Sequence, residues 1–147
     1  MKVNGKLSFH YLVSSFTFKN RSQIKNLFRI IIKKEKHDVS EIKFVFCSDA
    51  YLLKINAKFL KHRTLTDVVT FPLSEPDKPL CADVYISIER VRENAQKFHG
   101  SFQSELHRVL IHGILHLCGY KDKTQTQKNE MRKLEDYYMN FVSREIL

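Results

Sequence analysis

Two periods of hydrophobic and polar positions run along the chain, and they separate predicted strands from predicted helices. Short segments rich in β-branched and aromatic residues, with apolar side chains near every second position, predict strands over residues 6–13, 41–47, 66–71 and 82–88. Apolar residues spaced three and four apart predict five helices. The first begins at Asn20 or Ser22 and ends near residue 36, and the second begins at Ser48 or Asp49 and ends near residue 60. The third covers residues 89–98 and is closed by Gly100, the fourth runs from Ser101 or Ser104 to Gly119, and the fifth covers about 124–142.

This order of elements predicts one α+β domain over residues 1–147, with a four-stranded mixed sheet and helices packed on it. The third and fourth strands are expected to pair as neighbours. The segment that joins them, residues 72–79, holds all three prolines of the chain and is expected to be irregular.

The first predicted helix has a buried stripe and a basic stripe beside it. Ile24, Leu27, Phe28 and Ile31 form the apolar stripe, and Lys25, Arg29 and Lys33 recur every fourth residue on the adjacent face. The chain as a whole has a net charge of +9, which favours an anionic partner and nucleic acid first. The basic stripe could lie along phosphates or could simply be the solvated face, and charge alone does not decide.

Composition narrows the class of protein further. A hydrophobic content of 43% is typical of a folded globular chain, and no apolar run is long enough to span a bilayer. Residues 1–6 lack the layout of a signal peptide, so we expect a cytoplasmic protein without membrane association. Cys47, Cys81 and Cys118 are odd in number and widely spaced, and are expected to be small buried residues without disulfides.

The segment 112–122 carries the candidate chemistry, in the second half of the chain and on a predicted helix. His112 and His116 are four residues apart, so both imidazoles point to the same side of a helix. Gly119 can end that helix in a left-handed conformation and let the chain return Asp122 to the histidines. Two histidines and a carboxylate with an open position form a catalytic type of zinc site. The alternative is that both histidines are ordinary helix residues.

A zinc peptidase with this ligand spacing has a glutamate directly after the first histidine, and that glutamate is the general base. Gly113 occupies the position here and has no group that accepts a proton. The chain therefore has the ligand spacing of a zinc peptidase but lacks its general base. A hydrolase of another kind, or a purely structural metal site, is the better interpretation.

Three motifs resemble those of one known family. Residues 112–120 match the pattern His-Gly-x-Leu-His-Leu-x-Gly-Tyr, Thr66-Asp67-Val68 precedes Phe71-Pro72, and Met131 and Glu135 follow the histidine motif. In this the chain resembles the YbeY family of bacterial single-strand-specific endoribonucleases, from about residue 40 to the end. The resemblance implies a metal-dependent endoribonuclease that acts in ribosomal RNA maturation and ribosome quality control. It also implies one zinc ion, single-stranded ribosomal RNA as substrate, and ribosomal proteins as partners.

The chain departs from the family pattern at positions that bear on the chemistry. Asp122 stands where the family has its third histidine; a carboxylate can still coordinate, but as a harder ligand it could move the preference toward manganese or iron. The arginine to which the family's catalysis is attributed falls at Leu60, so Lys61, His62 or Arg63 of the same loop is expected to replace it as the catalytic cation. Ala82 replaces a glycine and is expected to affect only local backbone shape.

Two other functions stay open on the sequence. One is a non-catalytic RNA- or ribosome-binding protein whose metal only clamps the C-terminal turn, and the other, disfavoured by Gly113, is a zinc peptidase. Among the remaining polar residues, Asp67 and Asp83 are interpreted as turn caps at strand ends. Glu105 is either an exposed helix residue or the acceptor that orients a ligand histidine.

Overall fold

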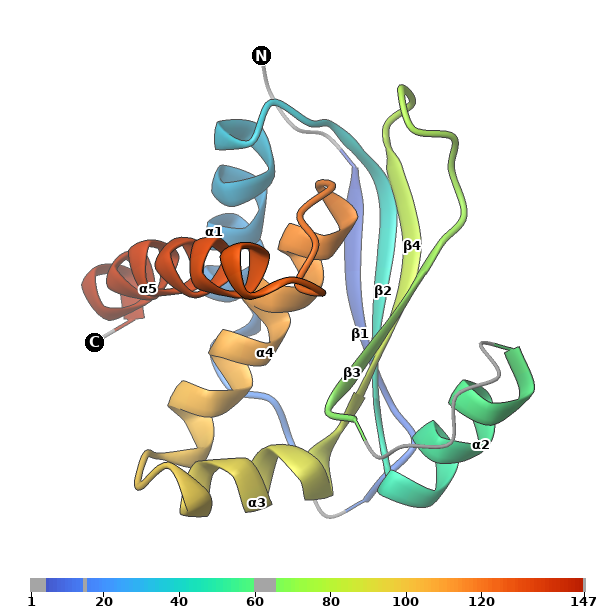
Figure 1. Ribbon diagram of the computed structural model, residues 1–147, viewed down its shortest axis with the longest axis vertical. Coiled ribbons are helices and arrows are strands. Elements are labelled where there is room, and N and C mark those ends of the chain that lie inside the picture. The colour runs from blue at the N-terminus through green and yellow to red at the C-terminus, as the bar shows by residue number, and fades with distance from the viewer. Residues whose placement is uncertain (1–4, 15, 60–65, 147) are drawn as a thin grey trace.

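The computed structural model describes residues 5–14, 16–59 and 66–146 of the chain (Figure 1). The elements in chain order are β1 (Lys6–Tyr11), α1 (Arg21–Lys34), β2 (Val39–Cys47), α2 (Asp49–Phe59), β3 (Val68–Pro72), β4 (Leu80–Ser87), α3 (Ile88–Lys97), α4 (Phe102–Leu117) and α5 (Gln125–Ile146). The expected strands and helices are all present, with bounds shifted by a few residues, and the architecture is α+β as predicted.

The four strands form one mixed sheet in the order β1-β2-β4-β3. β1, β2 and β4 run parallel, whereas β3 pairs antiparallel with β4, its predicted neighbour. The register places Phe9, Phe44, Val84 and Thr70 in one row across all four strands. Because alternate residues of a strand face opposite sides of the sheet, this row belongs to a single face.

The two faces of the sheet are covered unequally. α1, α4 and α5 lie on one side and α2 on the other (Figure 1). The larger core lies under α1 and α4, where Ile42, Phe44 and Phe46 of β2 are inaccessible to solvent. The predicted stripe of α1 is buried as expected, and Ile32 joins it. On the opposite face, Leu52 of α2 packs in a small separate cluster of buried residues with Cys47 and Val69.

Half of the residues of helix α4 are buried, and the helix packs closely against the sheet at Gly113. Leu110, Ile111, Ile114 and Leu115 are all inaccessible to solvent. A Cβ atom added to Gly113 would lie 3.3 Å from a methyl group of Val84 and 3.5 Å from one of Val68. A glutamate at this position would point into the sheet. The peptidase base is therefore excluded by packing as well as by residue type.

The two ends of α4 are fixed by local hydrogen bonds. Ser101 accepts a hydrogen bond from the backbone N–H of Ser104 at the start, as predicted for an N-cap. At the other end Gly119 is left-handed with a φ of 105°, and the N–H of Tyr120 donates to the carbonyl of Leu115 over 3.1 Å. This is the Schellman geometry that the glycine predicted. It reverses the chain and directs residues 120–124 back along the helix.

Two predicted helix ends are wrong in detail. The residue that turns the chain after α3 is His99, with a φ of 57°, and Gly100 instead donates its N–H to Ala95. Asn20 precedes α1, but its side chain makes no capping hydrogen bond. Its backbone is left-handed, whereas a capping side chain reaches the first turn from an extended backbone.

Two residues of the predicted basic stripe of α1, Lys25 and Arg29, make contacts at the β1 edge of the sheet. Arg29 donates a hydrogen bond of 2.7 Å to the carbonyl of Gly5, and the ammonium of Lys25 lies 5.9 Å from the ring centre of Phe9. β1 and β3 are the two opposite edges of the sheet.

The described residues bear on two expectations about composition. Cys47, Cys81 and Cys118 are all free thiols; Cys47 is buried as expected, whereas Cys81 and Cys118 are only partly buried. None of the helices described by the structure combines the length and the apolar character needed to cross a membrane.

Candidate metal centre

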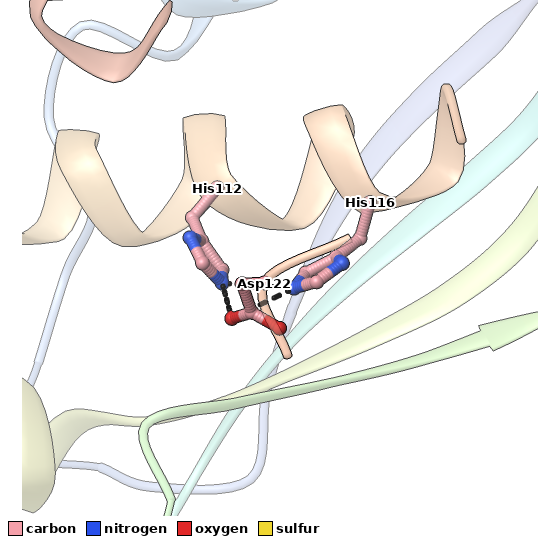
Figure 2. Close-up of side chains that lie close together, drawn as sticks. All are labelled: His112, His116 and Asp122. Carbon is pink, nitrogen blue, oxygen red and sulfur yellow. Dashed lines mark hydrogen bonds and ion pairs between the residues drawn. The ribbon is translucent and has the colours of Figure 1, made fainter. Parts of the chain in front are cut away.

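His112, His116 and Asp122 come together at the C-terminal half of α4 (Figure 2). The two histidines project from successive turns of the helix, and Asp122 reaches them from the loop that follows Gly119. The two Nε2 atoms are 2.9 Å apart. Oδ2 of Asp122 lies 3.3 Å from Nε2 of His112 and 3.5 Å from Nε2 of His116. The three residues identified from sequence spacing therefore face one point.

These separations fit a tetrahedral ion. Zinc binds nitrogen and oxygen at about 2.0–2.2 Å, so neighbouring ligands of a tetrahedral site are about 3.3–3.6 Å apart. The two distances to Asp122, 3.3 and 3.5 Å, match such edges, and the 2.9 Å between the two Nε2 atoms is somewhat shorter. Three protein ligands leave the fourth position open for water or a substrate oxygen, as in catalytic zinc sites.

The other nitrogen of each histidine is held by an acceptor. Nδ1 of His112 lies 2.6 Å from Oε2 of Glu135, and Nδ1 of His116 lies 2.9 Å from the backbone carbonyl of Tyr120. A carboxylate and a carbonyl can only accept, so both Nδ1 atoms carry the proton. Both Nε2 atoms then present lone pairs to the common point, which is the tautomer that a metal ion requires.

Glu135 is itself held in place by Arg108. It is only 6% exposed, and its Oε1 accepts a hydrogen bond of 3.2 Å from Arg108 of α4. Arg108 also donates to Asp136 over 2.8 Å. The carboxylate thus connects α5 with two residues of α4. The acceptor that orients His112 is thus Glu135 and not Glu105, the candidate that the sequence offered.

Tyr120, whose carbonyl accepts from His116, is itself held by a hydrogen bond of its side chain. The Tyr120 hydroxyl donates a 2.6 Å hydrogen bond to Glu35, the residue after α1, and the Tyr138 hydroxyl of α5 donates to the same carboxylate. The hydrogen bond to Glu35 raises the pKa of Tyr120 to about 12, so it remains a donor across the physiological range. The loop that carries Asp122 is therefore fastened to α1 and α5.

The charges around the histidines favour a cation. Burial works to lower the pKa of His112, but the hydrogen bond and charge of Glu135, together with the charges of Asp67 and Asp122, leave that pKa raised. Burial and the adjacent His112 lower the pKa of His116. The surroundings thus stabilise a positive charge at this point but oppose the protonation of both rings at the same time.

A cavity of about 1150 Å³ lies beside the cluster and is lined by parts of β3, α3, α4 and α5. Arg108, Lys128 and Arg132 bring positive charge to its walls. Lys61, His62 and Arg63, the predicted catalytic cations, lie outside the described residues. Asn56 and Thr66, which flank that segment in sequence, both line the cavity.

Of the two predicted turn caps, Asp67 directly precedes β3 and Asp83 lies inside β4. Asp67 also lines the cavity; its carboxylate accepts a hydrogen bond of 3.4 Å from Asn94, and burial raises its pKa. Burial, followed by the charge of Asp67, likewise raises the pKa of Glu105 in the same cavity. Asp83 lies within β4, paired with Lys43 and Phe71, so it does not cap a strand end.

The chain matches known proteins over most of its length. The family described as "Endoribonuclease YbeY" matches residues 12–143 of the chain. The chain belongs to the YbeY endoribonuclease family. A relative from Cytophaga hutchinsonii named "Endoribonuclease YbeY" is 46% identical over 123 residues, which cover 84% of this chain and 86% of the relative. A YbeY relative of the same name from Amoebophilus asiaticus is 43% identical over 136 residues, covering 91% and 92%.

The fold agrees with that of a solved structure as well. The solution structure of the Thermotoga maritima protein TM1509 superposes with a TM-score of 0.60 at 31% sequence identity, covering 90% of this chain and 86% of that one. The resemblance to the YbeY family drawn from the histidine and Thr-Asp-Val motifs is confirmed. The matched region extends further toward the N-terminus than those motifs indicated, because it includes α1.

The contact between Glu135 and His112 leads to a prediction about metal affinity. A Glu135→Gln variant keeps an oxygen acceptor but loses the charge that polarises the imidazole, so the affinity of the cluster for a divalent ion should fall about 10–100-fold. Competition against a chromophoric chelator measures it. Asp136→Asn is the matched control, since Asp136 contacts the same Arg108 but not the histidine. Equal affinities in the two variants would show that Glu135 does not support the site.

Proposed function

We propose that the protein is a metal-dependent endoribonuclease that cleaves single-stranded RNA, with one zinc ion held by His112, His116 and Asp122. The observation that carries the proposal is the near-tetrahedral spacing of three ligand atoms whose histidines have their outer nitrogens already occupied. The curated YbeY relatives support it through their name, endoribonuclease. The role in ribosomal RNA maturation comes with the family resemblance.

In this proposal some residues hold and orient the ligands of the metal ion, and others bind the RNA. A zinc ion bound here would polarise the scissile phosphate or activate a water molecule. Glu135 and the Tyr120 carbonyl keep the two imidazoles oriented. Lys128 and Arg132 lie one turn apart on α5 and line the cavity, where they can hold phosphate groups. Arg108 supports Glu135 and lines the same cavity.

Asp122 bears on the identity of the ion. Its carboxylate is a harder ligand than the third histidine of the family, so manganese or iron(II) competes with zinc more effectively than at a three-histidine site. Zinc remains our first proposal, because two imidazoles and one carboxylate are a common catalytic zinc set.

The partners follow from the substrate. A net charge of +9 supports binding to RNA through its phosphates. Ribosomal RNA as substrate would bring the protein into contact with ribosomal proteins and place it in the cytoplasm.

Cleavage of RNA with and without metal tests the function. Metal-loaded protein should cut a labelled single-stranded RNA internally, leave a duplex of the same sequence uncut, and lose the activity on chelation and in a His112→Ala, His116→Ala variant. Re-addition of zinc should restore the chelated wild type. RNA that is bound but never cut by metal-loaded protein would contradict the proposal and favour the RNA-binding protein with a structural metal.

We further propose that Lys61, His62 and Arg63 supply a cation to the developing charge on the phosphoryl oxygens. The support is positional, since the segment connects two residues that line the cavity, Asn56 and Thr66. It also follows the position of the family arginine, which is Leu60 in this chain.

Alanine at Lys61, His62 and Arg63 together should lower kcat for RNA cleavage by about 10²-fold, the usual effect of losing a preorganised charge donor. The free energy of unfolding should change little. The control changes Lys25, Arg29 and Lys33 to Gln, because these cations follow the β1 edge and the cavity adjoins β3. If the control lowers kcat as much as the alanine variant, the assignment of the cation to residues 61–63 is wrong.

A further inference from the structure

Phe98 is an exposed aromatic residue that lines the cavity of the candidate metal centre. Its side chain is 63% exposed, whereas Phe28, Phe44 and Phe46 are inaccessible to solvent. A single exposed apolar residue is ordinary on a protein surface. Phe98 differs by position, because it lines the same cavity as His112 and Asp122. The other large exposed hydrophobic residues of the described chain, Leu12, Ile30, Tyr51, Leu73 and Tyr137, are not part of that lining.

The backbone that carries Phe98 is fixed by hydrogen bonds. Phe98 is the C-cap of α3, and its N–H donates to the carbonyl of Asn94 over 3.0 Å. The N–H groups of His99 and Gly100 donate to Gln96 and Ala95 over 3.2 and 2.9 Å, completing a Schellman turn. The ring is therefore presented from a defined helix end.

A cation accompanies the ring. The ammonium of Lys97 lies 5.7 Å from the ring centre of Phe98. An exposed aromatic ring with a cation next to it is a combination that binds single-stranded nucleic acid, because a base can stack on the ring while a phosphate lies near the cation.

We infer that Phe98 is a base-stacking platform for single-stranded RNA in the cavity of the metal centre. This inference rests on the proposed function. Bases of a duplex are already stacked on their neighbours, so a protein ring that takes a base favours unpaired RNA. The platform adds a physical reason for single-strand preference to a site whose other groups contact phosphates.

The platform is separated from the cleavage point. Phe98 lies just before the start of α4 at Phe102, and His112 is ten residues further along the helix, about 15 Å at 1.5 Å per residue. We therefore expect the stacked base to belong to a nucleotide away from the scissile phosphate. Its loss should raise KM and leave kcat nearly unchanged.

The absence of tryptophan from the sequence allows a direct test. A Phe98→Trp variant carries a single indole, and its fluorescence should be quenched as a short oligoadenylate is titrated into chelator-treated protein, where binding proceeds without cleavage. In the metal-loaded protein, Phe98→Ala should raise KM for single-stranded RNA about 5–100-fold, as expected for the loss of one stacked base. Phe98→Trp should keep the wild-type KM.

Leu73 provides the matched control, since it is equally exposed at 63% and lies outside the cavity lining. Leu73→Trp should show no quenching, and Leu73→Ala should leave KM unchanged. Unquenched Phe98→Trp together with an unchanged KM in Phe98→Ala would overturn the platform while wild-type cleavage still upheld the endoribonuclease. A wild type that neither binds nor cuts RNA would instead overturn the proposed function and the platform with it.

Discussion

The packing of α4 against β3 and β4 is the constraint on which the site depends. Gly113 brings the helix so close to β4 that an added Cβ atom would lie only 3.3 Å from Val84, whose side chain would have to shift to make room. The buried leucines and isoleucines of α4 fix its rotation. His112 and His116 are consequently held on the side of the helix that faces the cavity. One element thus serves as the central core helix and as the support of two candidate ligands.

A second set of contacts orients the two imidazole rings and holds the loop that carries Asp122, which α4 alone cannot do. Glu135 connects His112 to α5, and the Tyr120 carbonyl orients His116 while the Tyr120 hydroxyl bonds to Glu35 beyond α1. Asp122 lies in the loop between these anchors. Removal of an outer partner should therefore alter the affinity for metal without removing a ligand, as is common for such partners of metal-bound histidines.

The parts of this arrangement that depend on short sequence separations could be predicted. The His112–His116 spacing and the turn at Gly119 are local, so they identified the cluster. The parallel order of β1, β2 and β4 depends on long-range pairing and could not be derived from the pattern. The burial of Glu135 could have been predicted, because its position falls on the apolar stripe of α5 between Met131 and Tyr138, both of which are buried. The spacing of Lys25 and Arg29 predicted a common face, but not which edge of the sheet it follows.

The position of a bound ion tests the central claim most directly. A crystal structure of the metal-loaded protein, with anomalous diffraction recorded at the absorption edge of the ion, would locate it. Our account predicts one ion bonded to Nε2 of His112, Nε2 of His116 and a carboxylate oxygen of Asp122, at about 2.0–2.2 Å each. An ion bound elsewhere on the protein, or bound through either Nδ1 atom, would contradict it.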